Sequence, residues 1–182
     1  MLEVRTPPSA WDQRLSSEFV AKSPEQALAT MTEEPYVNAV PLVIGGRGRS
    51  EVREFYANHF LSQIPPDMEL VPVSRTIGQG RVVDEFIARF THSIRMDWLL
   101  PGIESTGKRM EIPMVVIVRF EGDKVAHERF YWDQASLLLQ VGLLELTLPV
   151  RGGETAAQVL NPTQPMNELI RRALKKSRGS AD

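Results

Sequence analysis

The stretch HERFYWDQASLLLQVGLL, residues 127–144, holds the pattern that decides the fold. Its first half alternates between two kinds of side chain, as a β-strand with two different faces does. One face holds Ala126, Glu128, Phe130 and Trp132, and the other holds Val125, His127, Arg129, Tyr131 and Asp133. The second half, QASLLLQ, is apolar and predicts a short helix or a continued strand. The stretch therefore predicts a strand followed directly by a short helix or by a continuation of the strand.

Three more runs with a period of two precede this strand. Together the four runs are Glu69 to Ile77, Arg81 to Arg95, Arg109 to Glu121 and Lys124 to Trp132. Short turns at Gly78-Gln79-Gly80 and at residues 121–124 join neighbouring runs, which predicts antiparallel pairing in a meander.

Helical patterns lie before the meander. Ser9 or Asp12 can cap a first helix, and Ser23-Pro24-Glu25-Gln26 predicts a second from Pro24 to about Glu33. An extended run at residues 36–41 and a turn at GGRGR follow, and then a helix capped by Ser50 with an apolar stripe of Val52, Phe55, Tyr56 and Phe60. The glycine-rich segment lacks the lysine and the spacing of a phosphate loop. Helices first and a meander afterwards predict an α+β fold, in which a curved antiparallel sheet wraps around N-terminal helices and leaves a deep apolar pocket.

Composition narrows the possible partners. The chain has 182 residues, with 21 basic and 23 acidic side chains and a formal charge of −2, so we expect no binding to nucleic acid or to anionic membranes. It has no cysteine, which excludes thiolate nucleophiles and thiolate metal sites. The three histidines, His59, His92 and His127, lack the spacing of metal ligands, and no G-x-S-x-G element is present. We therefore expect neither a metal nor a cofactor.

The pattern predicts three segments. Residues 1–22 form an N-terminal arm or helix, residues 23–145 form the α+β domain, and residues 146–182 form a C-terminal arm. The arm ends in NELIRRALKKSRGSAD, an amphipathic helix with basic residues late, as suits the helix dipole. The first residues lack a basic and then apolar signal pattern, so we expect the cytoplasm as the location.

Five side chains with titratable groups are candidates for acid/base chemistry. Glu128, between Ala126 and Phe130, is the first, because a desolvated carboxyl group can transfer protons near neutral pH. In VVDEFIARFTHSIRMDWLLPG, residues 82–102, alternation places His92 on the apolar face and sends Arg95 and Asp97 outward, unless a bulge reverses them. The alternative to a catalytic role is a hydrogen-bonded core histidine for His92, and a surface ion pair for Arg95 and Asp97. Asp133 either caps the following helix or faces the pocket.

The run from Asp123 to Leu144 resembles the closing strand and terminal helix of SnoaL-like proteins, in which an aromatic-Asp pair precedes a Gln-x-Gly-Leu element. The resemblance covers about residues 24–145 and includes DWLLPG and the turn at Pro41. It implies the cone of the nuclear-transport-factor-like superfamily, also called cystatin-like, often as a dimer. Members include polyketide cyclases, ketosteroid isomerases, dehydratases and noncatalytic binders, so the fold alone selects no reaction.

A narrower resemblance is to limonene-epoxide-hydrolase-like enzymes. Tyr36-Val37-Asn38 is similar to the pair that holds a water there, and Arg95-Met96-Asp97 is similar to the Arg-x-Asp pair, which implies proton donation by Asp97 and orientation by Arg95. The chain departs from the family where a second Asp is required, because Phe130 stands at that place. The nearest acid on the same face is Glu128, roughly 7 Å along the strand.

These observations lead to two hypotheses from different classes. The first is a cofactor-independent enzyme, a cyclase, isomerase or epoxide hydrolase, that acts on a hydrophobic small molecule as a homodimer. Asp97, Arg95 and Glu128 form its acid/base unit if the second strand is bulged, and His92 with Asp133 if it is not. The expected substrate contacts are Tyr36, Asn38, Phe90, Trp98, Phe130, Tyr131 and Trp132. The second hypothesis is a noncatalytic ligand-binding or dimeric interaction protein of the same fold.

Overall fold

The structure, a computed structural model, describes residues 22–145, 147–162 and 165–179, so the helix expected near Ser9 or Asp12 lies outside the described residues. Its first elements are α2 (Pro24–Ala29), β1 (Met31–Ala39), β2 (Ile44–Arg47), α3 (Gly48–Phe55), a π-helical turn η2 (Tyr56–Phe60) and a 3-10 turn η3 (Leu61–Gln63). The others are β3 (Glu69–Gly78), β4 (Arg81–Thr91), β5 (Arg109–Glu121), β6 (Lys124–Trp132), α4 (Gln134–Val141), α5 (Glu154–Leu160) and α6 (Glu168–Gly179).

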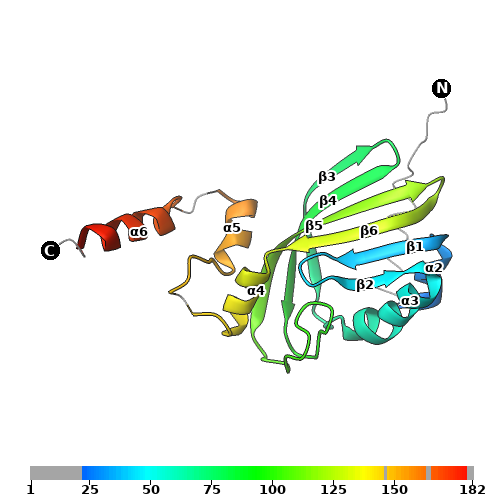
Figure 1. Cartoon of the computed structure of the whole chain (residues 1–182), viewed down its shortest axis with the longest axis horizontal. Helices are drawn as coiled ribbons and strands as arrows, with labels where there is room; N and C mark the ends of the chain where they lie inside the picture. The colour runs from blue at the N-terminus through cyan, green and yellow to red at the C-terminus, as the bar shows by residue number, and fades with distance from the viewer. Residues whose placement is uncertain (1–21, 146, 163–164, 180–182) are drawn as a thin grey trace.

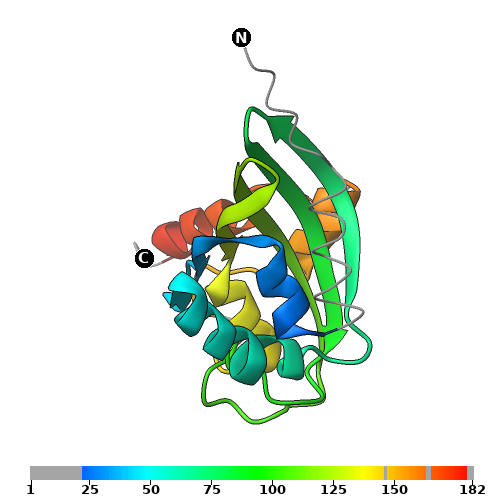
Figure 2. The ribbon, with the colours of Figure 1, turned by 90° about the vertical axis from the view of Figure 1, so that its right-hand side faces the viewer.

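The strands form one curved, open sheet in the order β2-β1-β6-β5-β4-β3 (Figure 1). Strands β3 to β6 pair antiparallel in chain order, which confirms the predicted meander. Strand β1 joins the sheet parallel to β6, and β2 pairs antiparallel with β1. Figure 2 shows the sheet curving around α2 and α3, so the expected α+β arrangement is confirmed.

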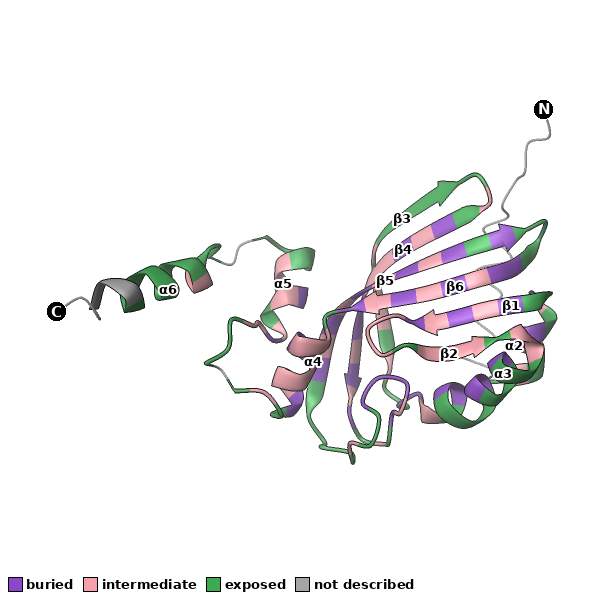
Figure 3. Ribbon diagram, in the orientation of Figure 1, coloured by how far each residue is buried: buried purple, intermediate pink, exposed green. Residues whose placement is uncertain are grey.

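Alternation gives the sheet two unlike faces, visible as purple and pink bands along the strands in Figure 3. The inner face lies against the helices and is buried; the register aligns on it Val37, Glu128, Val118 and Val82 in one row and Ala39, Phe130, Val116 and Asp84 in the next. The outer face is only partly covered and includes Tyr36, Asn38, His127, Arg129 and Tyr131. The core therefore sits between the inner face and the helices.

Helix α2 begins as predicted but ends early. The Ser23 hydroxyl accepts a hydrogen bond from the Gln26 backbone N–H over 3.3 Å, and Pro24 occupies the first helical position. The helix ends at Ala29 instead of continuing to about Glu33, because the chain from Met31 onward pairs with β6. This prediction was wrong since pairing across the sheet outweighs local helix preference.

The GGRGR segment is a strand and a helix start instead of a simple turn. A Cβ at Gly45 would lie 2.0 Å from the Val37 carbonyl oxygen, and a Cβ at Gly46 would lie 2.6 Å from the Glu51 backbone. Glycine is required there because three backbones approach closely. Helix α3 starts at Gly48, with Arg47 at the cap position, so Ser50 lies within the first turn and is not the cap.

The apolar stripe of α3 and η2 is confirmed, since Val52, Phe55, Tyr56 and Phe60 are all buried. Strand β4 ends at Thr91, short of the expected Arg95. After it, Met96, Leu99 and Leu100 enter the core with no exposed surface. Strict alternation stops here because the chain turns inward to fill the core beside η2.

The segment after α4 packs against the domain. Helix α5 was not predicted, and its Ala156 is fully buried. Gln140 Oε1 accepts a hydrogen bond from the Glu111 N–H over 3.0 Å, and the Ser136 hydroxyl donates to the Gly152 carbonyl over 3.1 Å. Within the part of the chain that is described, no helix combines the length and the apolar character needed to cross a bilayer.

Candidate active site

Glu128 lies on the inner face of β6 and is completely buried. Its Oε2 atom accepts a hydrogen bond from Tyr56 Oη over 3.1 Å. The register places Val37 of β1 on one side of it and Val118 of β5 on the other. The carboxyl group is thus held in an apolar layer by a hydroxyl from η2, in agreement with the desolvated position that alternation predicts.

Aromatic rings surround this layer. Phe60 packs against Phe130 with ring centroids 6.1 Å apart, and against Trp98 at 5.1 Å. Trp98 packs edge-on against Trp132 at 6.4 Å. Phe90, Trp98, Phe130 and Trp132 are all buried on the inner side, where a ligand-binding wall was expected.

A second acid, Asp84 of β4, lies on the same inner face and was missed by the sequence reasoning. Arg75 of β3 grips it through two parallel hydrogen bonds, Nε to Oδ1 at 2.6 Å and Nη2 to Oδ2 at 2.8 Å. Such a fork fixes both side chains in one orientation. The signal was present in the sequence, because Asp84 shares the parity of Phe86, Ala88 and Phe90.

The two acids share the inner face but lie well apart on it. Glu128 and Asp84 are two strands and two residues apart, which puts their Cα atoms roughly 12 Å from one another by strand spacing and rise. Beside Asp84 lies a depression of about 340 Å³. It is lined by Leu70, Pro72, Val73, Ser74, Arg75, Asp84, Glu85 and Phe86.

The pair expected to hold a water is not part of this site. Tyr36 stands opposite His127 in the register and Asn38 opposite Arg129, so both point away from Glu128. The Tyr36 ring lies 5.7 Å from the His127 ring and 5.8 Å from the Arg47 guanidinium carbon. Tyr131 also lies on this outer face. Tyr36, Asn38 and Tyr131 therefore do not gather around Glu128, because neighbouring positions on a strand face opposite sides.

Asp97 is held by other groups. Its Oδ1 accepts from Arg95 Nε over 2.7 Å, and its Oδ2 accepts from Gln63 Nε2 over 3.0 Å. Hydrogen bonds from Gln63 and then from Arg95 lower the pKa of Asp97 below its ordinary value. The lowered pKa favours the carboxylate form of Asp97, so its surroundings do not favour the expected role of proton donor.

The expected unit of Asp97, Arg95 and Glu128 does not form. Among described residues the polar partners of Asp97 come from η2, η3 and its own loop: His59, Gln63, Arg95 and Gly102. Asp97 ties the loop after β4 to η3, since its own backbone N–H also donates to Gln63 Oε1.

His92 and Asp133 do not form a pair either. His92 is completely buried, its Nδ1 accepts from the Thr106 N–H over 3.3 Å, and burial lowers its pKa. Asp133 is exposed, and its Oδ1 accepts from the N–H groups of Ala135 at 2.9 Å and Ser136 at 3.1 Å. Asp133 is the N-cap of α4, which confirms the capping alternative.

No three histidine, aspartate or glutamate side chains gather as metal ligands within residues 22–145, 147–162 and 165–179. The polar groups of the inner face are the buried carboxyl group of Glu128 with the Tyr56 phenol and the Asp84 carboxylate with the Arg75 guanidinium.

Solved structures share the fold. A hypothetical protein with a ketosteroid isomerase-like fold from Catenulispora acidiphila, in complex with trimethylamine, is 14% identical with a TM-score of 0.59, over 76% of this chain and 96% of that one. An NTF2-like protein of unknown function from Burkholderia pseudomallei is 17% identical with a TM-score of 0.56, over 78% of this chain and 99% of that one. TerC, co-crystallised with polyporic acid, is 15% identical with a TM-score of 0.53, over 73% of this chain and 95% of that one.

No curated protein matches the sequence. The model of the family described as SnoaL-like polyketide cyclase matches residues 11–141, which span the sheet, the helices packed on it and the buried Glu128. The chain therefore belongs to the SnoaL-like polyketide cyclase family and has the NTF2-like cone fold.

Proposed function

We propose that the chain is a cofactor-independent enzyme of the cyclase or isomerase type, which moves a proton at a carbon next to a carbonyl group of a hydrophobic small molecule. The observation that carries the proposal is the completely buried carboxyl group of Glu128, held by Tyr56 Oη at 3.1 Å. Burying a carboxyl group away from water lowers the stability of the fold. Carboxyl groups that are buried in this way are found most often at functional sites.

In this mechanism the Glu128 carboxylate removes a proton from the carbon next to the carbonyl group, which leaves an enolate. The protonated Glu128 then returns this proton to another carbon of the enolate system. Tyr56 donates its hydrogen bond to Oε2 and so holds the carboxyl group at one angle. Phe60, Phe130 and Trp98 exclude water, which strengthens the interactions of the reacting charges.

The substrate class follows from the lining. Phe130 follows Glu128 on the inner face of β6 and packs against Phe60, and the separation of roughly 12 Å between the two acids suits a molecule of several rings. The family supports a polyketide-like substrate, and TerC, which shares this fold, was co-crystallised with the small molecule polyporic acid. Epoxide opening is less well supported, because Tyr36 and Asn38 face away from Glu128.

Deuterium exchange tests the proposal without knowledge of the natural substrate. The protein is incubated in D₂O with a panel of cyclic and aromatic β-keto compounds, and incorporation of deuterium next to the carbonyl is measured by mass spectrometry. Wild type is expected to accelerate exchange of at least one compound, and Glu128→Gln to lose this by about 100-fold or more. Asp123→Asn, in the exposed turn between β5 and β6, is the matched control and should keep wild-type exchange.

The same panel separates the two classes of function. Equal exchange in Glu128→Gln and wild type would contradict the assigned role of Glu128. Compounds that raise the melting temperature of wild type and Glu128→Gln alike, with no exchange in either, would instead support the noncatalytic ligand-binding protein.

A further inference from the structure

Helix α6 is a basic amphipathic helix at the far end of the molecule. In sequence it holds Arg171, Arg172, Lys175, Lys176 and Arg178 against one acid, Glu168. Because the whole chain carries −2, this surplus of four positive charges leaves −6 on the remainder. The helix and the body of the protein are therefore oppositely charged.

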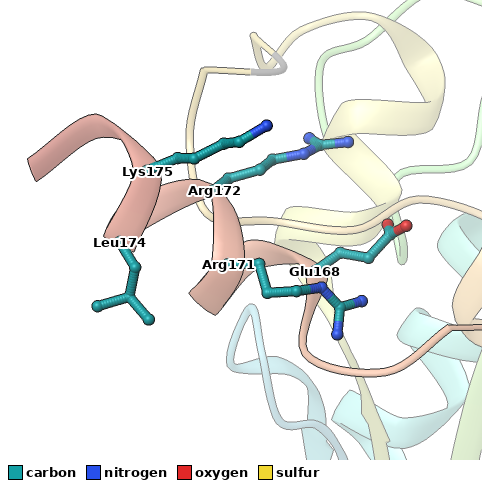
Figure 4. Close-up of a pocket in the computed structure, with 5 residues that line it drawn as sticks. All are labelled: Glu168, Arg171, Arg172, Leu174 and Lys175. Carbon is teal, nitrogen blue, oxygen red and sulfur yellow. The ribbon is translucent and has the colours of Figure 1, made fainter. Parts of the chain in front are cut away.

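The apolar side of α6 is exposed. Helical spacing places Leu169, Ile170, Ala173 and Leu174 on one side. Ile170 is 60% exposed and Leu174 is 53% exposed. Figure 4 shows Leu174 on one side of the helix and Arg172 with Lys175 on the other. Exposed apolar side chains in this pattern mark an interaction surface.

The start of α6 is tied to a neighbouring segment of its own chain, at the end of the molecule that lies far from α2 and α3. Arg151 Nη2 binds Glu168 Oε2 at 2.8 Å and so ties the start of α6 to the segment before α5. In Figure 1 α6 and the pair α2 and α3 lie at opposite ends of the molecule. A surface on α2 and α3 is thus out of reach of the α6 of the same chain.

That opposite end carries a groove of about 820 Å³ that suits α6 in charge and polarity. It is lined by Glu25, Ile44, Gly45, Ser50, Glu51, Arg53, Glu54, Phe55, Ala57 and His59. Its acids outnumber its single arginine, Arg53, which already pairs with Glu25. Ile44 and Phe55 supply an apolar floor, and Val43 beside it is 84% exposed.

We propose that α6 of one copy docks in the α2–α3 groove of a second copy. Its apolar side covers Ile44 and Phe55, and its basic residues meet Glu51 and Glu54. Two copies placed antiparallel make this contact twice, which closes a two-fold dimer. An anionic membrane fits less well as the partner, because the −6 body would be repelled from it.

Cysteine cross-linking tests the contact against a clean background, because the natural chain has no cysteine. Full-length chains with Ala173→Cys are mixed with chains that carry Ala57→Cys and oxidised mildly. Ala173 lies on the apolar side of α6 and Ala57 lines the groove. The mixed disulfide is expected at least about tenfold more than with Thr76→Cys, which sits exposed on the edge strand β3.

Charge exchange tests the specificity of the contact. Combined Glu51→Lys and Glu54→Lys should weaken dimerisation at least about tenfold, measured by analytical ultracentrifugation, and added Arg171→Glu and Arg172→Glu should recover most of it. Raising the salt to 1 M should weaken the wild-type dimer. Monomeric wild type, equal cross-linking at Ala57 and Thr76, or co-sedimentation of a monomer with phosphatidylserine vesicles would each overturn the proposal.

Discussion

Tyr56 and Glu128, 72 positions apart in the chain, are joined by a hydrogen bond of 3.1 Å from the phenol to the carboxyl group. Both side chains are completely buried, so the bond links η2 to the inner face of β6 across the core. It is the contact by which the helices hold the proposed proton-transfer group in place.

Tyr56→Phe is expected to lower the free energy of unfolding by about 1–3 kcal/mol, because the buried Oε2 loses its donor. Urea denaturation at pH 7 measures this loss. Tyr131→Phe, on the half-buried outer face, is the control and should change stability by less than about 0.5 kcal/mol. Adding Glu128→Leu to Tyr56→Phe should restore most of the stability, since the polar pair is then removed as a whole. A double variant less stable than Tyr56→Phe would argue that Glu128 has further stabilising roles.

Asp97→Asn should reduce stability at neutral pH and leave deuterium exchange intact. The folded-state pKa of Asp97 is lowered, chiefly by Gln63 and then by Arg95. A carboxyl group with a lowered pKa stabilises the fold above its unfolded value of about 3.9 and loses this contribution as the pH falls through the folded pKa. The wild-type curve of unfolding free energy should therefore drop more steeply below about pH 4 than that of Asp97→Asn. Loss of exchange in a folded Asp97→Asn would place Asp97 in the reaction after all.

His92→Gln is expected to flatten the curve of unfolding free energy against pH just below about pH 6.5. Burial lowers the pKa of His92, so the unfolded chain binds a proton that the folded chain resists. The contribution of neutral His92 to the free energy of unfolding is therefore fully present above the unfolded pKa of about 6.5, and it is lost as the pH falls toward the folded pKa. His127, whose pKa is lowered by burial and by Arg119, adds a slope of the same sign and is kept in both proteins. Equal slopes for wild type and His92→Gln would refute the assignment to His92.

Asp133→Ala should lower the free energy of unfolding by about 0.5–2 kcal/mol, because the first turn of α4 loses its cap. Thermal unfolding by circular dichroism is a sufficient measurement. Asp133→Asn caps nearly as well and should stay within about 0.5 kcal/mol of wild type. Deuterium exchange should persist in both variants, since Asp133 is exposed and bonded to the backbone of α4.

The patterns that predicted structure correctly are those with local causes. Ser23 and Pro24 start α2, Asp133 caps α4, and the short turns around residues 78–80 and 121–124 pair consecutive strands, so each could be read from a few adjacent residues. The predictions that failed depend on distant partners. Met31 to Ala39 became a strand because β6 pairs with it, and β4 stopped at Thr91 because the core beside η2 had to be filled.

The site divides in the same way. Alternation along the strands is enough to place Glu128 and Asp84 on the apolar face. It does not predict that Arg75 of β3 binds Asp84, because that contact joins two strands. The tripeptides around Tyr36 and Asp97 gave no direction, because a short pattern does not state which side of the sheet faces the helices.

By itself the sequence determined the meander, the start of α2 and a carboxyl group turned toward the core, since these follow from periodicity and local hydrogen bonding, while its closing motif resembled the SnoaL-like family. The tertiary structure alone decided that Tyr56 meets Glu128, that Arg75 meets Asp84, and that Asp97 belongs to the loop beside η3. Such pairings join residues far apart in the chain, and they exist only where packing of the sheet against the helices brings their backbones together.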